Sequence, residues 1–220
     1  MANLQKKYWD RKINEWSHAS YNKQSKISFV EKIATFFRSV NKRKDAAILI
    51  VGKQAKGKCI LDLGCGLGEF TFEILKHSPK KILAYDISQV AIRHIKTNVK
   101  KNKLNNKIAC KVVDASKLKS IPQCDMVIGL GFIDYFTPSE LKHLFKIIGT
   151  KPYLFSFFEK KVSLFNLLHK IYITIQNCPG AYKYSRQEIE SFIPKKSAVY
   201  FFEKDGLQFM SNSRKFAFSK

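Results

Sequence analysis

A cluster of three glycines behind an acidic residue is the part of this sequence whose types and spacing best suit chemistry. Gly64, Gly66 and Gly68 fall within five positions of the stretch "KCILDLGCGLGEFTFEIL", residues 58–75. Glycine inside regular structure costs conformational entropy, so the cluster indicates either a turn that other residues cannot make or a close approach of a ligand. An apolar run ending near Asp62 precedes it and an amphipathic run follows. The stretch therefore predicts a strand, a glycine loop and a helix whose first N–H groups face a ligand.

The spacing of these glycines separates the loop from the dinucleotide-binding fingerprint. That fingerprint, G-x-G-x-x-G, has its third glycine five positions after the first. Here Glu69 occupies that position, and the third glycine, Gly68, comes one position earlier. An acidic side chain beside the turn is unfavourable for a pyrophosphate. We therefore expect a cationic or zwitterionic ligand rather than one with two phosphates.

Five strand-like runs alternate with amphipathic helical patterns around this loop. The strands are expected at 58–64, 80–86, 107–114, 124–131 and 151–158, and the helices at about 68–77, 89–102 and 138–148. Such alternation is typical of βαβ units with a parallel sheet and right-handed crossovers. Ligands of these sheets bind at the carboxyl ends of the strands, where the sequence places Asp86 and Asp114.

The segments outside this core have patterns of their own. Helical periodicity is found before the core at 27–40 and 46–51, and after it at 160–176. Ser185 with Glu188 forms a capping-box pattern, and two strands surround a "KDG" turn near the end.

We interpret the chain as a single domain with four parts. These are an N-terminal helical lid (1–57), a cofactor-binding core (58–158), an acceptor-site cover (159–195) and a closing β-hairpin (196–220).

The core, over about residues 58–160, resembles the class I S-adenosylmethionine-dependent methyltransferases. The stretch "ILDLGCGLG" is similar to the first motif of that family, and "LAYDIS" and "VVDAS" follow in order at the ends of the next two strands. Asp125 begins the fourth strand in "CDMVIGLGFIDYF", at a position that is usually structural in the family. The later "LGFIDYF" and "CPGAYKYS" resemble bacterial small-molecule methyltransferases distantly related to the magnesium-protoporphyrin O-methyltransferases.

This resemblance implies a fold and a cofactor. The fold is an α/β, Rossmann-like three-layer sandwich with a seven-stranded, mostly parallel sheet of order 3-2-1-4-5-7-6 and an antiparallel last strand. The cofactor is S-adenosylmethionine, released as S-adenosylhomocysteine. In the family, the residue matching Asp86 accepts hydrogen bonds from both ribose hydroxyls, the one matching Asp114 holds the adenine amino group, and Ala115 would lie against the ring. The expected cofactor-binding set is Asp62, Gly64, Cys65, Gly66, Gly68, Asp86, Ile87, Asp114, Ala115 and Gly129.

Methyl transfer to a hydroxyl requires a positioned donor and acceptor and a group that removes a proton. A carboxylate acceptor would need no base. Asp134 and Tyr135 lie just beyond the fourth strand, and His18 and His169 lie in the covering segments. We take Asp134, Tyr135 and His169 as the catalytic candidates, while a capping role for Asp134 before "TPSEL" stays open. The expected acceptor is a small molecule, hydrophobic in one interpretation, methylated at oxygen rather than nitrogen.

The net charge of +23 raises the alternative of a nucleic-acid partner. Of the 40 basic residues, 34 are Lys, whereas phosphate and base recognition favours the fork of Arg. Residues 93–119 hold nine basic residues and only Asp114 as an acid, which indicates a solvated surface first and a patch facing RNA or an anionic membrane second. The basic amphipathic helix at 160–176 offers another membrane contact.

The residues after the fourth strand bear on the kind of acceptor. They lack the "NPPY" or "DPPY" typical of enzymes that methylate a flipped base. Methylation of RNA elsewhere remains an alternative, as does a non-catalytic S-adenosylmethionine-binding protein.

The compartment and metal content follow from simpler features. No apolar stretch approaches the roughly 18 residues of a membrane span, and no signal-peptide core is present, so we expect a cytoplasmic protein without a transmembrane segment. The five cysteines lack C-x-x-C spacing, which indicates free thiols and no metal site.

Overall fold

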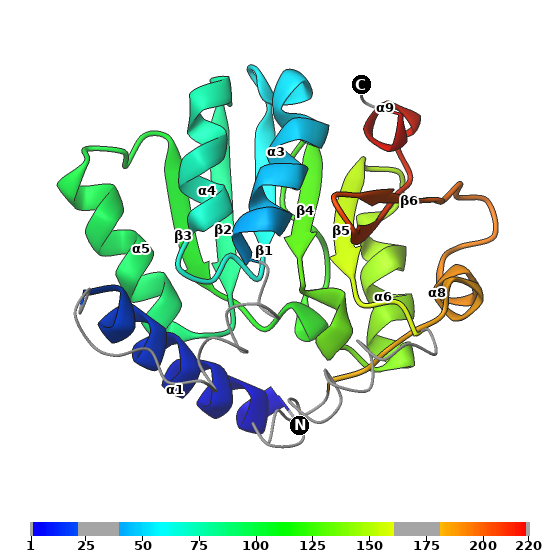
Figure 1. The fold of residues 1–220 in the computed structure, drawn as a ribbon, viewed down its shortest axis with the longest axis horizontal. Coiled ribbons are helices and arrows are strands. Elements are labelled where there is room, and N and C mark those ends of the chain that lie inside the picture. The colour runs from blue at the N-terminus through cyan, green and yellow to red at the C-terminus, as the bar shows by residue number, and fades with distance from the viewer. Residues whose placement is uncertain (1, 22–39, 161–180, 219–220) are drawn as a thin grey trace.

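A computed structural model describes the fold over residues 2–21, 40–160 and 181–218 (Figure 1). Its strands are β1 (Cys59–Leu63), β2 (Lys81–Asp86), β3 (Ile108–Val112), β4 (Met126–Leu130), β5 (Tyr153–Phe157), β6 (Tyr200–Lys204) and β7 (Leu207–Ser211). Its α-helices are α1 (Ala2–Tyr21), α3 (Val40–Ala55), α4 (Glu69–Glu73), α5 (Gln89–Lys101), α6 (Pro138–Ile148), α8 (Arg186–Phe192) and α9 (Arg214–Ala217). Short 3-10 turns are η1 (Ile74–His77), η2 (Ala115–Lys117) and η3 (Ile133–Tyr135).

The strands form one seven-stranded sheet in the order β3-β2-β1-β4-β5-β7-β6. β1 to β5 pair in parallel, and β7 lies antiparallel between β5 and β6. The strand order, the parallel core and the antiparallel last strand predicted from the sequence are all confirmed.

Helices cover both faces of this sheet, as Figure 1 shows. On one face, buried residues of α3, α4 and α5 pack against alternate strand residues such as Ile60 and Ile128. On the other, α6 and α8 pack against the residues in between, such as Leu61 and Val127. Because parallel strands are covered on two sides, their sequences are continuous apolar runs rather than alternating ones.

The closing hairpin is set by its turn. Asp205 and Gly206 both have positive φ, 53° and 77°. A two-residue turn with both central residues in this region matches the twist of the flanking strands, and Asp-Gly is well suited to it. The "KDG" turn predicted from the sequence is therefore confirmed.

Two elements differ from the sequence-based expectation. The helix expected at 46–51 begins earlier and ends later, at Val40–Ala55, and packs into the core with Ala46, Ala47 and Val51 fully buried. It does so although it lies within the segment expected to form the lid. The short α9 was not expected.

The helical patterns at 27–40 and 160–176 lie almost entirely outside the described residues. Among the described helices, none is long and apolar enough to span a membrane.

Candidate active site

The glycine loop between β1 and α4 is fastened to the end of β2. The N–H groups of Gly64 and Cys65 both donate to the carbonyl of Tyr85, at 2.8 and 3.2 Å. Gly66 has φ 54°, and a Cβ placed on it would meet no described atom within 4 Å, whereas a Cβ on Gly64 would lie 2.7 Å from the ring of Phe132. The loop thus needs its glycines for backbone conformation and packing, and at Gly66 it also leaves the backbone open to approach.

Asp86 closes β2 and faces this loop. Its Oδ2 accepts from the N–H of Gly66 at 2.9 Å, and its Oδ1 accepts from the N–H of Ser88 at 2.8 Å. Burial raises the pKa of Asp86, and the backbone hydrogen bonds oppose that rise. Each carboxylate oxygen has a further lone pair. Asp86 therefore fixes the loop and still offers two acceptors to a ligand.

Asp62 lies beneath the loop rather than on its surface. It is buried, and its Oδ2 accepts from Thr71 Oγ1 at 2.6 Å, which joins β1 to α4. Burial, with smaller contributions from Asp86 and Glu69, raises the pKa of Asp62 to about 7. Its described contact is structural.

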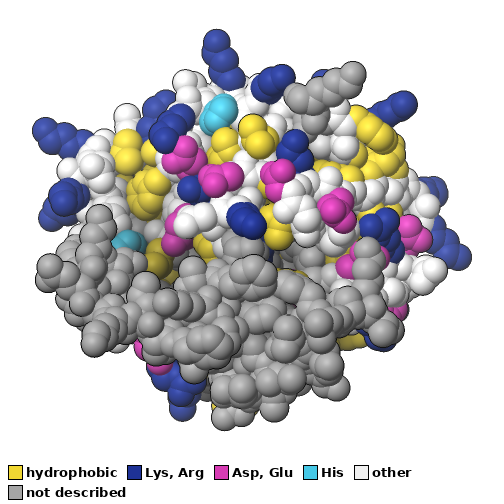
Figure 2. Space-filling model, viewed as in Figure 1, with side chains coloured by type: hydrophobic (Ala, Val, Ile, Leu, Met, Phe, Trp, Pro, Cys, Tyr) yellow, Lys and Arg dark blue, Asp and Glu magenta, His cyan; other side chains and the backbone are white. Residues whose placement is uncertain are grey.

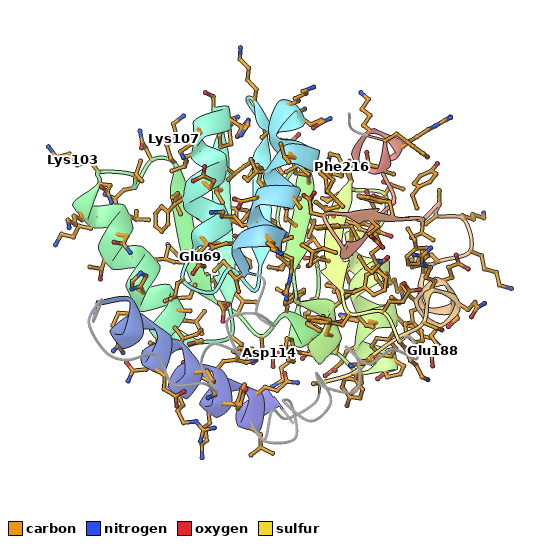
Figure 3. The ribbon with its side chains drawn as sticks, in the orientation of Figure 1. Glu69, Lys103, Lys107, Asp114, Glu188 and Phe216 are labelled. Carbon is orange, nitrogen blue, oxygen red and sulfur yellow. The ribbon has the colours of Figure 1, made fainter. Side chains whose placement is uncertain are left out.

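Asp114 follows β3 at the same edge of the sheet as the loop (Figure 3). Its Oδ1 accepts from the backbone N–H and hydroxyl of Ser116 at 3.1 and 2.6 Å, and Lys117 lies 3.4 Å from its Oδ2. The next residue, Ala115, is buried. The carbonyl of Asp86 accepts from the N–H of Val113 at 2.8 Å, so the ends of β2 and β3 are held together.

The remaining expected cofactor residues differ in their surroundings. Cys65 is buried in the core, and burial raises the pKa of its thiol well above its ordinary value. Ile87 is half-buried beside Asp86. Gly129 lies inside β4, where a Cβ would come 2.6 Å from the ring of Phe155. Packing alone therefore requires glycine at position 129.

The helix α1 spans the carboxyl edge of the sheet (Figure 1). Its Asp10 accepts from Ser88 Oγ at 2.6 Å and from the N–H of Val90 at 3.3 Å, at the start of α5. Nearer the N-terminus of α1, Gln5 Nε2 donates to the carbonyl of Tyr135 at 2.9 Å. These contacts join the residues after β2 to those after β4.

Asp134 is a buried carboxylate at the end of β4. Its Oδ1 accepts from the N–H of Phe158 at 3.1 Å, and its carbonyl accepts from the N–H of Tyr182 at 2.7 Å. Its Oδ2 has no hydrogen-bond partner among the described residues. Burial raises the pKa of Asp134 to about 6, while the Phe158 N–H, Arg43 and Lys183 lower it.

The capping role that the sequence left open for Asp134 is wrong. α6 is capped by Thr137, whose side chain accepts from the N–H of Glu140 while the Glu140 carboxylate accepts from the N–H of Thr137.

Tyr135 is brought to the same place, but His169 is not among the described residues. The ring of Trp9 meets that of Tyr135 edge to face at 5.0 Å between centroids. His169 lies outside the described part of the chain, and the side chain of His18 is likewise not described.

Arg43 is a charged residue of this region that the sequence analysis did not single out. It comes from the first turns of α3, and its guanidinium packs on Gly131, where a Cβ would overlap Nη1. Its Cζ lies 5.1 Å from the ring centroid of Phe158. Burial lowers the pKa of Arg43, while the charges of Asp134 and Tyr135 raise it.

A signal for Arg43 was present in the sequence. It precedes Ala46, Ala47 and Ile50 by three, four and seven positions, which puts a charge in phase with the buried stripe of α3.

Comparison with known proteins agrees with this geometry. Residues 60–150 match the protein family described as a methyltransferase domain. No curated protein sequence matches the chain.

Solved structures are similar over most of the chain. The magnesium protoporphyrin IX methyltransferase of Synechocystis PCC 6803, solved with bound SAH, is 16% identical with a TM-score of 0.69, covering 96% of this chain and 99% of that one. Human N-acetylserotonin methyltransferase, in complex with SAM, is 14% identical with a TM-score of 0.60, covering 83% and 55%. An O-methyltransferase family protein from Burkholderia thailandensis is 12% identical with a TM-score of 0.62, covering 79% and 55%.

The glycine loop, the acidic strand ends and the strand order therefore agree with these comparisons: residues 60–150 match a methyltransferase domain, and the chain has the fold of the class I S-adenosylmethionine-dependent methyltransferases.

Proposed function

We propose that this protein transfers a methyl group from S-adenosylmethionine to the oxygen of a small-molecule acceptor, with Asp134 as the base. The observation that carries the proposal is the Oδ2 atom of Asp134. It is buried, has no hydrogen-bond partner among the described residues, and belongs to the turn just beyond β4, where the next residue, Tyr135, meets the Trp9 ring. A buried acceptor left without a donor is costly, so its retention favours a functional role.

The residues at the carboxyl edge of the sheet suit this cofactor. The backbone at Gly66 is open, and Asp86 beside it offers two carboxylate oxygens to ribose hydroxyls. Asp114 and Ala115 lie one strand further along and would hold the adenine. Arg43 offers a guanidinium fork, the group best matched to the carboxylate of the methionyl part. The cofactor, when bound, supplies an electrophilic methyl group on a sulfonium.

Asp134 would take the proton that a hydroxyl acceptor must lose. The acceptor O–H proton moves to Oδ2, and the acceptor oxygen keeps the electron pair that forms the new bond to carbon. A pKa of about 6 leaves Asp134 mostly ionised at neutral pH and still basic enough to help an acidic hydroxyl. Activity should therefore rise with pH through about 6.

The surroundings of Asp134 favour a planar, apolar acceptor that carries its hydroxyl at one end. Trp9 and Tyr135 meet edge to face, and Phe132 meets Phe136 in the same way at 4.7 Å between centroids. Phenols and enols combine such a surface with an acidic O–H. The O-methyltransferase family protein among the similar structures supports oxygen over nitrogen as the methyl acceptor.

The proposal also assigns roles to α1, Tyr135 and His169. α1 would act as the lid, because it joins the end of β2 to the end of β4. Tyr135 would line the acceptor site, and His169 remains a candidate for a second proton-transfer group.

The competing functions make different demands on Asp134. A non-catalytic cofactor-binding protein needs no buried base, and a carboxylate-methylating enzyme needs none either. An RNA methyltransferase would need RNA to reach the carboxyl end of β4, beneath α1.

The test combines cofactor binding with turnover. Isothermal titration with S-adenosylmethionine, S-adenosylhomocysteine and NAD should show binding of the two sulfur compounds alone. A panel of phenolic, enolic, carboxylic and amine acceptors, plus short RNA, is then assayed for S-adenosylhomocysteine formation with wild type and Asp134→Asn.

We expect turnover with hydroxyl acceptors and a roughly 10²- to 10⁴-fold loss in Asp134→Asn with unchanged cofactor affinity. Equal turnover by the variant would remove Asp134 as the base. Turnover only with amines or RNA would contradict the proposed hydroxyl acceptor. If neither S-adenosylmethionine nor S-adenosylhomocysteine bound, the proposed methyltransferase function would be wrong.

A further inference from the structure

We propose that the sheet edge formed by α5 and β3 is a docking surface for an anionic lipid bilayer. We call this surface the basic edge. It consists of nine exposed residues: Arg93, Lys96, Lys100, Lys101, Lys103, Lys107, Lys111, Lys117 and Lys119. The proposal concerns where the protein resides and does not depend on the identity of its methyl acceptor.

These residues come from one continuous part of the chain: α5, the turn after it, β3, and the segment after β3 with Lys117 in η2 and Lys119 just beyond it. Arg93, Lys96 and Lys100 recur three and four positions apart along α5, whose opposite face is buried through Ile92 and Ile95. β3, which packs against α5, is the edge strand of the sheet and contributes Lys111.

Lys103 and Lys107 extend the row at the turn between α5 and β3. Figure 3 shows both pointing outward, far from Asp114 at the carboxyl edge. Lys and Arg side chains also project around the outline of the face in Figure 2, including the side where Figure 1 places α5.

The positive charge of the basic edge is almost uncompensated. Between residues 93 and 119 the only acid is Asp114, which pairs with Lys117 at 3.4 Å. The other eight residues make no ion pair within the described parts of the chain. Elsewhere basic side chains do find acids, as Lys76 does with Glu73 at 2.6 Å and Arg186 with Glu159 at 3.0 Å.

The composition of this edge favours a bilayer over RNA. The chain contains 18 Phe and 9 Tyr, yet no aromatic residue occurs between Tyr85 and Phe132. Proteins that bind single-stranded RNA stack bases on aromatic rings and use the planar Arg fork. A surface of eight Lys and one Arg instead supplies compact charges, which suffice for adsorption to anionic headgroups.

Protection of an edge strand explains only part of the pattern. Lys on an edge strand prevents pairing with another sheet, which accounts for Lys111. The row on α5 is remote from any strand hydrogen bond, so this explanation does not extend to it.

The experiment compares two triple variants with the same change in net charge. Lys96→Glu, Lys100→Glu and Lys107→Glu reverse the basic edge. Lys195→Glu, Lys196→Glu and Lys215→Glu reverse exposed lysines near α8 and in α9, toward the opposite end of the sheet. Vesicles of phosphatidylglycerol mixed with phosphatidylcholine, and of phosphatidylcholine alone, are sedimented with each full-length protein at low and high salt. A Lys→Gln triple at the first three positions guards against misfolding by charge reversal.

We expect wild type and the opposite-end variant to bind anionic vesicles at low salt and the basic-edge variant to bind at least about tenfold more weakly. The Gln triple should bind with intermediate strength, and binding should fall with salt. Equal losses in the two Glu triples would overturn the proposal in favour of undirected net charge. The proposal would also be overturned if wild type bound neither kind of vesicle. It would be overturned as well if the basic-edge variant lost tight binding to short RNA but kept its binding to vesicles.

Discussion

Opposite charges from distant parts of the sequence meet at the end of β4. Arg43 from α3 packs over Gly131, and Asp134 lies three residues further along the same loop. A guanidinium near a buried carboxylate favours its ionised form, and its field acts against the rise that burial causes in the pKa of Asp134. In the proposed function, Arg43 would thus both bind the carboxylate of the ligand and help to keep Asp134, the proposed base, ionised.

Replacing Arg43 should affect both roles. In Arg43→Met we expect cofactor affinity to fall by about tenfold or more, since a charge-assisted hydrogen bond is lost. The acid limb of the pH–rate profile should move to higher pH, because Asp134 loses a neighbour that lowers its pKa. Arg43→Lys keeps the charge without the fork, so it should restore the acid limb more fully than the affinity. Unchanged affinity and pH profile in Arg43→Met would exclude both roles.

Asp86 gives a separate test of the ribose assignment. Asp86→Ala removes the proposed ribose acceptors and also the partner of the Gly66 N–H. We expect a large loss of affinity for S-adenosylmethionine and S-adenosylhomocysteine by titration calorimetry, with the circular dichroism of the sheet retained. Asp86→Asn keeps one carbonyl oxygen and should lose less. Wild-type affinity in the Ala variant would show that the ribose is held elsewhere.

At the scale of elements, α1 is attached at two separated points. Asp10 contacts Ser88 and Val90 at the start of α5, and Gln5 contacts Tyr135 after β4. A helix held in this way over the carboxyl edge must move for a ligand beneath it to exchange.

Loosening one attachment should therefore speed exchange. In Asp10→Ala, loss of the Ser88 and Val90 hydrogen bonds should raise the dissociation rate of S-adenosylhomocysteine several-fold in stopped-flow displacement. Glu15→Ala is the matched control, since Glu15 pairs with Lys12 at 2.8 Å within α1 itself. Equal rates in wild type and Asp10→Ala would argue against α1 as a lid.

Local pattern explains which elements were predictable. The parallel strands are buried on two sides and so stand out as apolar runs, and the turn of the last hairpin is encoded by Asp205 and Gly206. The true start of α3 was missed, because residues 40–42 are exposed and the polar run 41–45 has no apolar periodicity. Contacts such as Asp10 with Ser88 join residues 78 positions apart, and no local rule relates such residues.

The same distinction applies to the site. The positions of the glycine loop, Asp86 and Asp114 at the carboxyl ends of the strands were predicted, because strand ends and motif spacing are visible in the sequence. That Asp62 lies beneath the loop and bonds Thr71 depends on how α4 packs on β1. The burial of Asp134, with one oxygen left unpartnered among the described residues, likewise depends on where β5 and the 182–184 segment come to rest.

At the scale of the whole molecule, the site should set how stability depends on pH. Burial raises the pKa of Asp62 to about 7 and that of Asp134 to about 6, whereas an unfolded Asp titrates near 3.9. Between about pH 4 and pH 7 these two groups therefore bind more protons in the native state than in the unfolded state, and their contribution to the free energy of unfolding falls as pH rises.

Asp62→Asn isolates one of these contributions. Its side-chain oxygen can still accept from Thr71, so the packing of β1 on α4 should survive. We expect the variant to become progressively more stable relative to wild type from about pH 4 to about pH 7, approaching about 1.4 kcal/mol for each unit by which folding raises the pKa of Asp62. Urea unfolding of both proteins across this pH range measures the difference in their free energies of unfolding. The other charges of this +23 chain are the same in both proteins, so their contributions cancel in the difference. A difference that does not change with pH would mean that Asp62 is ionised throughout in the folded protein. The acid beneath the glycine loop would then carry a full negative charge near the place proposed for the sulfonium of the cofactor.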